Sequence, residues 1–317
     1  MREPVHILGL DIGGTKIAGG IVSFPGGEVS LRREIPTRPE RPGGEVLADA
    51  VAFARELASE AARASAVIAG IGAGVAELVD HDGNVTSRQT IQWLGVPVRQ
   101  KLSELAPAVV EADVRAAALA EAMLGAGRPF RLFVYVTVGT GISYCLVQDG
   151  KPYAGARGGA LVFATGALTT TCTECGAELH PVIEEFASGP GLVRRYNEAS
   201  GAGLSRGEEV AALARYNDER AAEIVRSAGK ALGVGVAWLV NTLDPEAVVV
   251  GGGLGLAGGL YWDSFVESAR GHIWSDAARP LPILMAVHGI DAGIVGAACA
   301  FLAKGNLQPP MNADERR

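Results

Sequence analysis

The chain has few of the features that mark a nucleic-acid-binding or membrane protein. Its 28 lysine and arginine residues are scattered and form no run, and with 35 acidic residues they give a net charge of −7. This balance argues against a nucleic-acid partner, because nucleic acids are bound by clustered positive charge. No apolar segment approaches the roughly 18 residues that a membrane-spanning helix needs. We therefore expect neither a nucleic acid nor a membrane as a partner.

Cysteine is also scarce. The chain has four cysteines, Cys145, Cys172, Cys175 and Cys299. They are too few and too scattered for a disulfide framework in a chain of this length. No signal-peptide pattern precedes the first predicted strand. These features predict a reduced, cytoplasmic protein.

Glycine and aliphatic residues, by contrast, are abundant. The chain contains 43 glycines, and 48% of its residues are hydrophobic. A chain of this length and apolar content can bury a sizeable core, and its length favours two domains over one. Apolar patterning predicts strands at 5–11, 17–23, 28–35 and 68–75 and a helix at about 44–64. The fold class predicted from this order is α/β.

The most informative stretch is residues 8–22, where an apolar strand ends in Asp11 and a second strand follows after a short turn. The turn consists of Gly13, Gly14 and Thr15. Its free amides are suited to phosphate oxygens, and Asp11 is suited to a phosphate-bound Mg²⁺. Lys16 could reach a phosphate, or it could be a solvated strand lysine. The stretch is not a P-loop, because no Gly-Lys-Ser/Thr leads into a helix.

Two later segments repeat the theme of a buried strand that ends in glycines. The first is an apolar strand at 132–139 with a turn formed by Gly139, Thr140 and Gly141. It resembles the N-terminal hairpin as an internal duplication, and two such hairpins facing one another could grip a polyphosphate. The second is the strand 247–250, which runs into Gly252 and Gly253. We expect a helix to follow it, whose N-terminal dipole would favour an anion. The alternative is that all three are ordinary strand-to-turn junctions.

With these three turns in place, the chain resembles the ROK family (repressors, open reading frames and sugar kinases), which has an actin-like ATPase fold. The segments 111–121, 184–189 and 291–298 resemble further family signatures. The resemblance implies two actin-like (ribonuclease H-like) domains with an interdomain cleft. We expect a small N-terminal domain at 1–112, onto which a C-terminal helix at about 293–308 packs back, and a larger domain at 113–292. No helix-turn-helix precedes the first strand, so we expect the kinase branch of the family rather than the repressor branch.

The resemblance implies a glucokinase-like enzyme that uses ATP and Mg²⁺ to phosphorylate a hydroxyl of a small carbohydrate or polyol. Asp113 would be the general base, although an aspartate at a strand-to-helix junction is also a favoured N-cap. The nucleotide would be held by Asp11, Gly13, Gly14, Thr15, Lys16, Gly139, Thr140, Gly141, Gly252 and Gly253. The substrate would contact Asp113, Ala112, Gly158 and Glu184. Homodimers are common among such kinases, and by analogy we expect one here.

Several positions depart from the family pattern around the sugar. The asparagine that precedes the base in the family is Ala112 here, and a glutamate and a histidine that bind sugar are replaced by Val162 and Thr165. Hydroxyls of an ordinary hexose would then be buried without partners. Family base rates favour a hexose such as glucose, whereas these positions favour a cyclitol or a modified sugar. The alternative is a catalytically weak or inactive protein that binds sugar or nucleotide.

The family's zinc motif, Cys-x-Cys-Gly-x-x-Gly-Cys, is altered as well. Here Cys172 and Cys175 are separated by two residues, and His180 falls where the third cysteine would be. This spacing suits zinc, so the three residues form a candidate Zn²⁺ site. The alternative is a loop with two free thiols.

Overall fold

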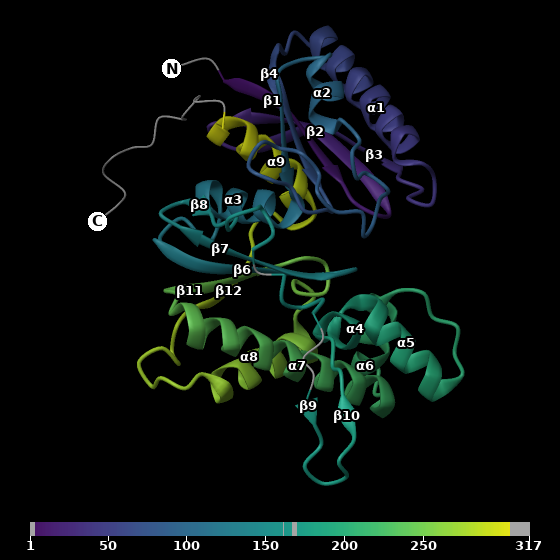
Figure 1. Ribbon diagram of the computed structural model, residues 1–317, viewed down its shortest axis with the longest axis vertical. Coiled ribbons are helices and arrows are strands. Elements are labelled where there is room, and N and C mark those ends of the chain that lie inside the picture. Colours follow the sequence, from purple (N-terminus) through teal and green to yellow (C-terminus); the bar gives the residue numbers. More distant parts are fainter. Residues whose placement is uncertain (1–3, 161, 167–169, 305–317) are drawn as a thin grey trace. The chain divides into compact units, whose positions relative to one another are not determined.

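The computed structural model describes residues 4–160, 162–166 and 170–304. Two five-stranded sheets form its framework, with strand orders β3-β2-β1-β4-β5 and β12-β11-β6-β7-β8 (Figure 1). The strands of the first sheet are β1 (Val5–Ile12), β2 (Lys16–Phe24), β3 (Glu28–Pro36), β4 (Ile68–Val75) and β5 (Ala108–Ala112). Those of the second are β6 (Leu132–Val138), β7 (Ile142–Gln148), β8 (Lys151–Pro152), β11 (Ala247–Gly251) and β12 (Ile283–Met285).

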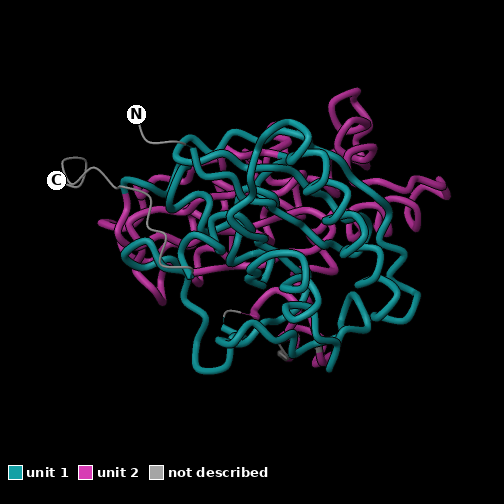
Figure 2. Tube along the Cα trace, turned by 90° about the horizontal axis from the view of Figure 1, so that it is seen from above, with its two compact units in different colours: residues 1–129, 147–160, 290–317 teal, residues 130–146, 161–289 magenta. Residues whose placement is uncertain are grey.

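The chain divides into two compact units, which Figure 2 draws in different colours. Unit 1 contains the described parts of residues 1–129, 147–160 and 290–317, and unit 2 contains those of 130–146 and 161–289. The helix that follows β5 therefore belongs to unit 1. The domain boundary expected at residue 112 stays a prediction.

The central strands of the first sheet, β1, β2 and β4, are buried on both faces because a separate apolar core covers each face. In β1, Leu8 and Leu10 pack into one core together with Phe53 of α1 (Gly43–Arg63). Ile7 points to the opposite core, which contains residues of α3 (Asp113–Leu124) and α9 (Ala292–Lys304). This is the period of two expected of a strand whose neighbours cover both sides. The strands predicted at 5–11, 17–23, 28–35 and 68–75 and the helix at 44–64 are confirmed to within two residues at each end.

Helix α9 lies directly on β1 and β4 (Figure 1). A methyl group added at Gly72 of β4 would overlap the carbonyl oxygen of Ala297. The helix backbone can therefore come this close only because the strand has no side chain at that position. This contact fixes the height of α9 above the sheet, and with it the position of the helix's first turn.

Unit 2 packs its helices against β6 and β11. Apolar side chains of α7 (Glu219–Leu243), among them Leu232 and Val236, share one core with Val134 and Val250 of these strands. The remaining helices are α4 (Ile183–Ala187), α5 (Gly189–Ser200), α6 (Gly207–Arg215) and α8 (Gly259–His272). A short hairpin, β9 (Thr170–Thr171) and β10 (Glu178–Leu179), projects from this unit (Figure 1). A further helix, α2 (Val98–Ser103), belongs to unit 1, and the chain passes from unit 2 to unit 1 within a 3₁₀ turn, Gly289–Asp291.

The helix predicted to follow β11 is α8, which begins at Gly259. A turn precedes it, in which the Leu256 amide donates to the carbonyl of Gly252 at 2.9 Å, so the helix begins after this turn and not at the glycines. In the described part of the chain, no helix combines the length and apolarity that crossing a membrane would require.

Because α9 packs so closely against β4, we predict that Gly72→Ala destabilises unit 1. Because the added methyl would overlap backbone rather than a flexible side chain, we expect a loss of about 1 to 3 kcal/mol in the free energy of unfolding. Gly44→Ala in α1 is the matched control, since nothing lies within 4 Å of a methyl group there. Urea denaturation of both variants checks this; equal stabilities would contradict the packing.

Candidate active site

Asp11 ends the buried run of β1 and lies beside the start of α9. Its carboxylate occupies the space that a side chain at Gly293 would fill, so the second residue of α9 must be small. Burial raises the pKa of Asp11 from 3.8 to about 6, and the charge of Lys16 opposes that rise. Asp11 is therefore a carboxylate whose ionisation the fold resists and which a bound cation would stabilise.

The turn after Asp11 is fixed by two threonines. Thr37, which is fully buried, donates its hydroxyl to the carbonyl of Gly13 at 2.6 Å, and its amide donates to Thr15 at 3.1 Å. A methyl group added at Gly14 would overlap the Cγ2 atom of Thr90. Gly14 is thus needed in part because Thr90 packs against it, which the sequence did not indicate.

Lys16 lies beyond the turn, where its ammonium pairs with the Glu34 carboxylate on β3 at 2.8 Å. Both side chains are about half exposed, with relative exposures of 51% and 46%. The structure therefore shows Lys16 as an exposed strand lysine. A phosphate role for Lys16 stays a prediction.

Asp113 is the first residue of α3, directly after β5. The N-cap position is taken by Ala112, so Asp113 is not the N-cap of this helix. Its Oδ1 atom accepts a hydrogen bond from the Val114 amide at 2.6 Å. Burial and the charge of Asp11 raise the pKa of Asp113 to about 7, with a smaller contribution from Glu77, while the Val114 amide and Arg115 lower it. A carboxylate with this pKa is suited to accept a proton near neutral pH.

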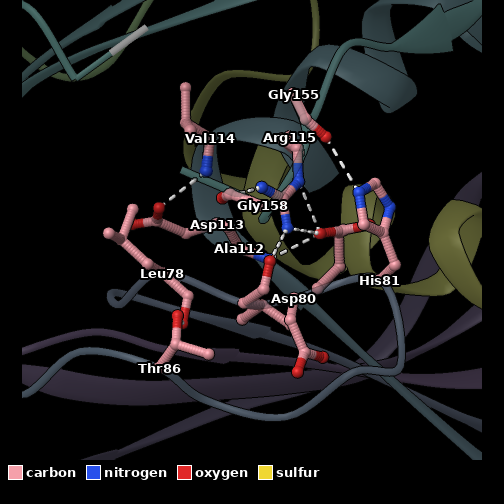
Figure 3. Close-up of polar contacts among 12 residues, drawn as sticks. Leu78, Asp80, His81, Thr86, Ala112, Asp113, Val114, Arg115, Gly155 and Gly158 are labelled. Carbon is pink, nitrogen blue, oxygen red and sulfur yellow. Dashed lines mark hydrogen bonds and ion pairs between the residues drawn. The ribbon is translucent and has the colours of Figure 1, made fainter. Parts of the chain in front are cut away.

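A buried arginine organises the surroundings of Asp113 (Figure 3). The Arg115 guanidinium donates to the Glu111 carboxylate at 2.7 Å and to the carbonyls of Gly158 and Val79, each at 2.6 Å. One side chain thus ties α3 to the segment after β4 and to the loop around Gly158. Lys304, near the end of α9, adds a contact of 3.3 Å to Glu111.

Two predicted substrate residues belong to this network. Glu111 accepts the amide of Ala112 at 2.9 Å, and Ala112 is only 3% exposed. Gly158 has a φ of 82°, and a methyl group there would overlap the carbonyl of Val79. Both residues are closely packed, and a contact of either with substrate stays a prediction.

In unit 2, the turn between β6 and β7 is closed by the Gly139 amide, which donates to the Gly141 carbonyl at 2.9 Å. The turn is also held from outside: the Gly189 amide donates to the Gly139 carbonyl at 2.9 Å, and Oε2 of Glu184 in α4 accepts the Ile142 amide at 2.7 Å. Glu184 therefore holds the turn that was predicted to bind phosphate. The sugar contact expected of Glu184 stays a prediction.

The glycines after β11 lie beside the same turn. Gly252 has a φ of 82°, a conformation that favours glycine, and a methyl group there would also overlap the carbonyl of Val138. Gly253 differs, because the nearest atom to a methyl group would be Oε1 of Glu208, at 3.9 Å. A methyl group at Gly139 would lie 3.9 Å from the Gly253 amide, so unit 2 brings its two predicted phosphate turns together.

The candidate zinc residues lie on and near the hairpin formed by β9 and β10. Across the described residues, no three His, Cys, Asp or Glu side chains gather as metal donors. Cys175 and His180 are exposed, and the His180 ring lies 3.7 Å from the Glu178 carboxylate. The donors as arranged do not fit a structural zinc ion.

Comparison with known proteins shows the family. A model of the ROK family matches residues 7–304. The chain belongs to the ROK family. The chain is 32% identical to the glucokinase of Streptomyces coelicolor over 311 residues, which cover 92% of this chain and 96% of that protein. It is 30% identical to the N-acetylmannosamine kinase of Escherichia coli O139:H28, covering 94% of this chain and 98% of that one.

Among solved structures, the ROK glucokinase of Streptomyces griseus in complex with glucose and AMPPNP matches with a TM-score of 0.79 and 30% identity. The match covers 92% of this chain and 98% of that one. The protein is therefore a glucokinase-like member of the ROK family and a homologue of sugar kinases. The two-domain α/β fold predicted from the sequence is confirmed by this likeness.

Three site residues of this ROK protein were missed by sequence reasoning: Glu77, Arg115 and Thr37. Each is a polar side chain that the fold buries, with relative exposures of 6%, 6% and 0%. Glu77 comes two residues after the apolar strand 68–75, and such an isolated carboxylate at the end of a parallel strand is a usable signal. Arg115 has one local partner, Glu111, four residues earlier, but its bonds to the carbonyls of Gly158 and Val79 join residues distant in sequence. The partners of Thr37 are distant as well, so no local pattern points to these contacts.

The raised pKa values predict how stability depends on pH. The folded chain holds protons on Asp11 and Asp113 up to about pH 6 and 7, whereas the unfolded chain releases them near 3.8. The stabilisation is thus fully present below the unfolded pKa and is lost as pH rises through the folded values. Asp113→Asn removes a carboxyl group that the folded chain resists ionising. The variant should therefore raise the free energy of unfolding by about 1 to 2 kcal/mol more at pH 8 than at pH 5, a figure reduced to allow for the partial exposure of the side chain.

Urea denaturation at the two pH values measures this difference. Asp263→Asn, which removes a carboxylate at an exposed position on α8, is the control. Equal gains for the two variants would contradict the raised pKa of Asp113.

Proposed function

We propose that this protein transfers the γ-phosphoryl group of ATP to a hydroxyl of a sugar, with Asp113 as the general base. The observation that carries the proposal is the placement of Asp113: it opens α3, and its carboxylate has a pKa of about 7. Kinases in the ROK family act on glucose and on N-acetylmannosamine in the relatives named above. The S. griseus relative holds glucose together with the nucleotide AMPPNP.

In the proposed reaction, Asp113 accepts the proton of the acceptor hydroxyl as its oxygen attacks the γ-phosphorus. The bond between that phosphorus and the oxygen bridging to the β-phosphate breaks, and ADP leaves. Phosphoryl transfer needs mainly positioning and charge stabilisation, so one base with the right pKa suffices for the proton. The network of Arg115 and Glu111 would hold α3, and thereby Asp113, in place.

Asp11 suits a magnesium ion bound with the nucleotide. Mg²⁺ is usually held by one or two carboxylates together with substrate phosphates, and the half-buried carboxylate of Asp11 beside a glycine turn matches that pattern. The ion would neutralise charge on the phosphates. The amides of Gly14 and Thr15 would bind phosphate oxygens in unit 1, whereas the predicted role of the Gly13 amide conflicts with its hydrogen bond to the Lys16 carbonyl at 3.0 Å.

The two adjacent glycine turns of unit 2 would themselves bind nucleotide. Thr140 and Gly141 would face phosphates, and Gly253 would line the adenosine side. The support is the open space beside Gly253 and the bracing of the other turn by Glu184. The expected homodimer stays a prediction.

The sugar itself is a finer proposal. Ala112 and Val162 carry no polar group where family members bind sugar hydroxyls, which favours a modified sugar or a cyclitol over glucose. A buried hydroxyl without a partner loses about 1 to 3 kcal/mol, enough to change the preferred substrate. Glucose, N-acetylmannosamine, aminosugars and cyclitols are therefore the panel to compare.

An assay of ADP release over this panel tests the function, with wild type and Asp113→Asn side by side. We expect turnover on one substrate class and a loss of about 10² to 10⁴ in kcat for the variant, because the base is removed while the shape is kept. ATP binding, measured by calorimetry, should persist in both proteins. If the wild type binds ATP but releases no ADP with any substrate of the panel, the result would instead support a binding protein. ADP release without any acceptor would indicate an ATPase.

Gly253→Ala tests the nucleotide site separately. Because the added methyl meets nothing closer than 3.9 Å, we expect a folded protein with unchanged melting temperature. If ATP lies against this turn, its KM should rise about tenfold, equivalent to roughly 1.4 kcal/mol of binding, with the KM for sugar unchanged. Gly271→Ala, another open position, is the control. An unchanged KM for ATP would place the nucleotide elsewhere.

A further inference from the structure

Glu77 is a buried carboxylate that the proposed reaction does not use. It lies two residues after β4 and is 6% exposed. Its Oε1 atom accepts the amides of Thr90 at 2.6 Å and Ile91 at 2.8 Å. Its Oε2 atom accepts the amide of Gln89 at 3.0 Å and the hydroxyl of Ser87. Four donors from one short segment thus converge on a single side chain.

These bonds decide the conformation of residues 87–91. The segment has no strand or helix of its own, so its backbone amides would otherwise lack partners. Charge-assisted bonds to a carboxylate are stronger than bonds to a neutral acceptor, and a carboxylate is buried only when it is satisfied in this way. The hydroxyl of Ser87 also accepts the Leu78 amide at 2.8 Å, which ties the segment to the chain beside Glu77.

The far end of the segment is anchored independently. Trp93 is fully buried and donates its indole N–H to the carbonyl of Gly43 at 3.0 Å. Between Trp93 and Ser87 the chain has little freedom, and the side chains of Arg88, Gln89 and Thr90 are exposed. The segment therefore presents polar side chains from a rigid backbone.

The segment lies beside the parts of unit 1 assigned to catalysis. Thr90 packs against Gly14 of the phosphate turn. The Ala76 amide, next to Glu77, donates to the carbonyl of Ile12 at 3.1 Å, which places Glu77 at the end of β1. The negative charge of Glu77 also contributes to the raised pKa of Asp113. An acceptor whose hydroxyl reaches Asp113 would thus lie near residues 87–91.

We propose that Glu77 is a positioning residue that fixes residues 87–91 as a preformed wall for the acceptor and holds Thr90 on the phosphate turn. The inference rests on the proposed sugar-kinase function. A polyhydroxylated acceptor is the ligand class that such a wall suits, because its exposed side chains offer hydrogen-bond donors and acceptors at fixed positions.

Glu77→Gln tests the proposal, because it keeps the size but places an NH₂ group against N–H donors. For the best substrate of the panel we expect the KM for the acceptor to rise about tenfold or more, with the KM for ATP within about twofold. Ser87→Ala, which removes one of the four donors, should move the acceptor KM in the same direction by a smaller factor. A merely structural role would lower stability and leave these ratios unchanged.

Glu121→Gln is the matched control. Glu121 is fully buried in α3 and accepts the Ala126 amide at 2.8 Å, so it is another buried carboxylate of unit 1 that holds backbone. We expect its variant to lose stability with an unchanged acceptor KM. If both variants raise that KM equally, Glu77 has no special role.

Amide hydrogen exchange tests whether Glu77 holds residues 87–91 in place, and it needs no enzymatic turnover. In Glu77→Gln the amides of Gln89, Thr90 and Ile91 should exchange at least about tenfold faster, with the rest of unit 1 unchanged. Unchanged exchange at these three amides would overturn the proposal. If the wild type phosphorylates nothing in the panel, the kinase function fails while the exchange result still stands or falls by itself.

Discussion

The close packing of α9 against the first sheet is the constraint on which the rest of unit 1 depends. The helix can touch the strand backbone because Gly72 has no side chain, and it can touch α3 because Gly296 has none beside the backbone of Ala116. This close approach also brings the first turn of α9 against Asp11, where Gly293 leaves room for the carboxylate. A shift of α9 by the width of one methyl group would therefore disturb the sheet, α3 and the candidate metal ligand together.

The site concentrates negative charge in a poorly solvated place. Burial and the charges of Asp11 and Glu77 raise the pKa of Asp113, and Arg115 offsets that rise only in part; burial alone raises the pKa of Asp11. This arrangement destabilises the folded chain at alkaline pH, yet it gives Asp113 the proton affinity that a base near neutral pH requires. The protein thus loses some folding stability where the reaction needs a reactive group, which is a common trade-off between stability and activity.

Backbone-holding carboxylates recur in both units. Glu77 gathers three amides of residues 87–91 in unit 1, and Glu184 accepts the amide that follows the glycine turn in unit 2. A carboxylate can satisfy several donors at once, so one side chain can shape a loop that has no regular structure. ROK relatives act on glucose or N-acetylmannosamine with one fold, and loops shaped in this way can change without altering the sheets.

The sequence by itself determined the strands, the glycine turns and the position of Asp113 after β5, because period-two patterning and turn residues are local signals. It also supported the family assignment. Only the tertiary structure decided that Ala112 is the N-cap, that α8 begins at Gly259 and that Gly14 makes room for Thr90. The roles of Glu77 and Arg115 likewise appear only in the fold, since they depend on pairs of residues far apart in the chain, which local spacing does not encode.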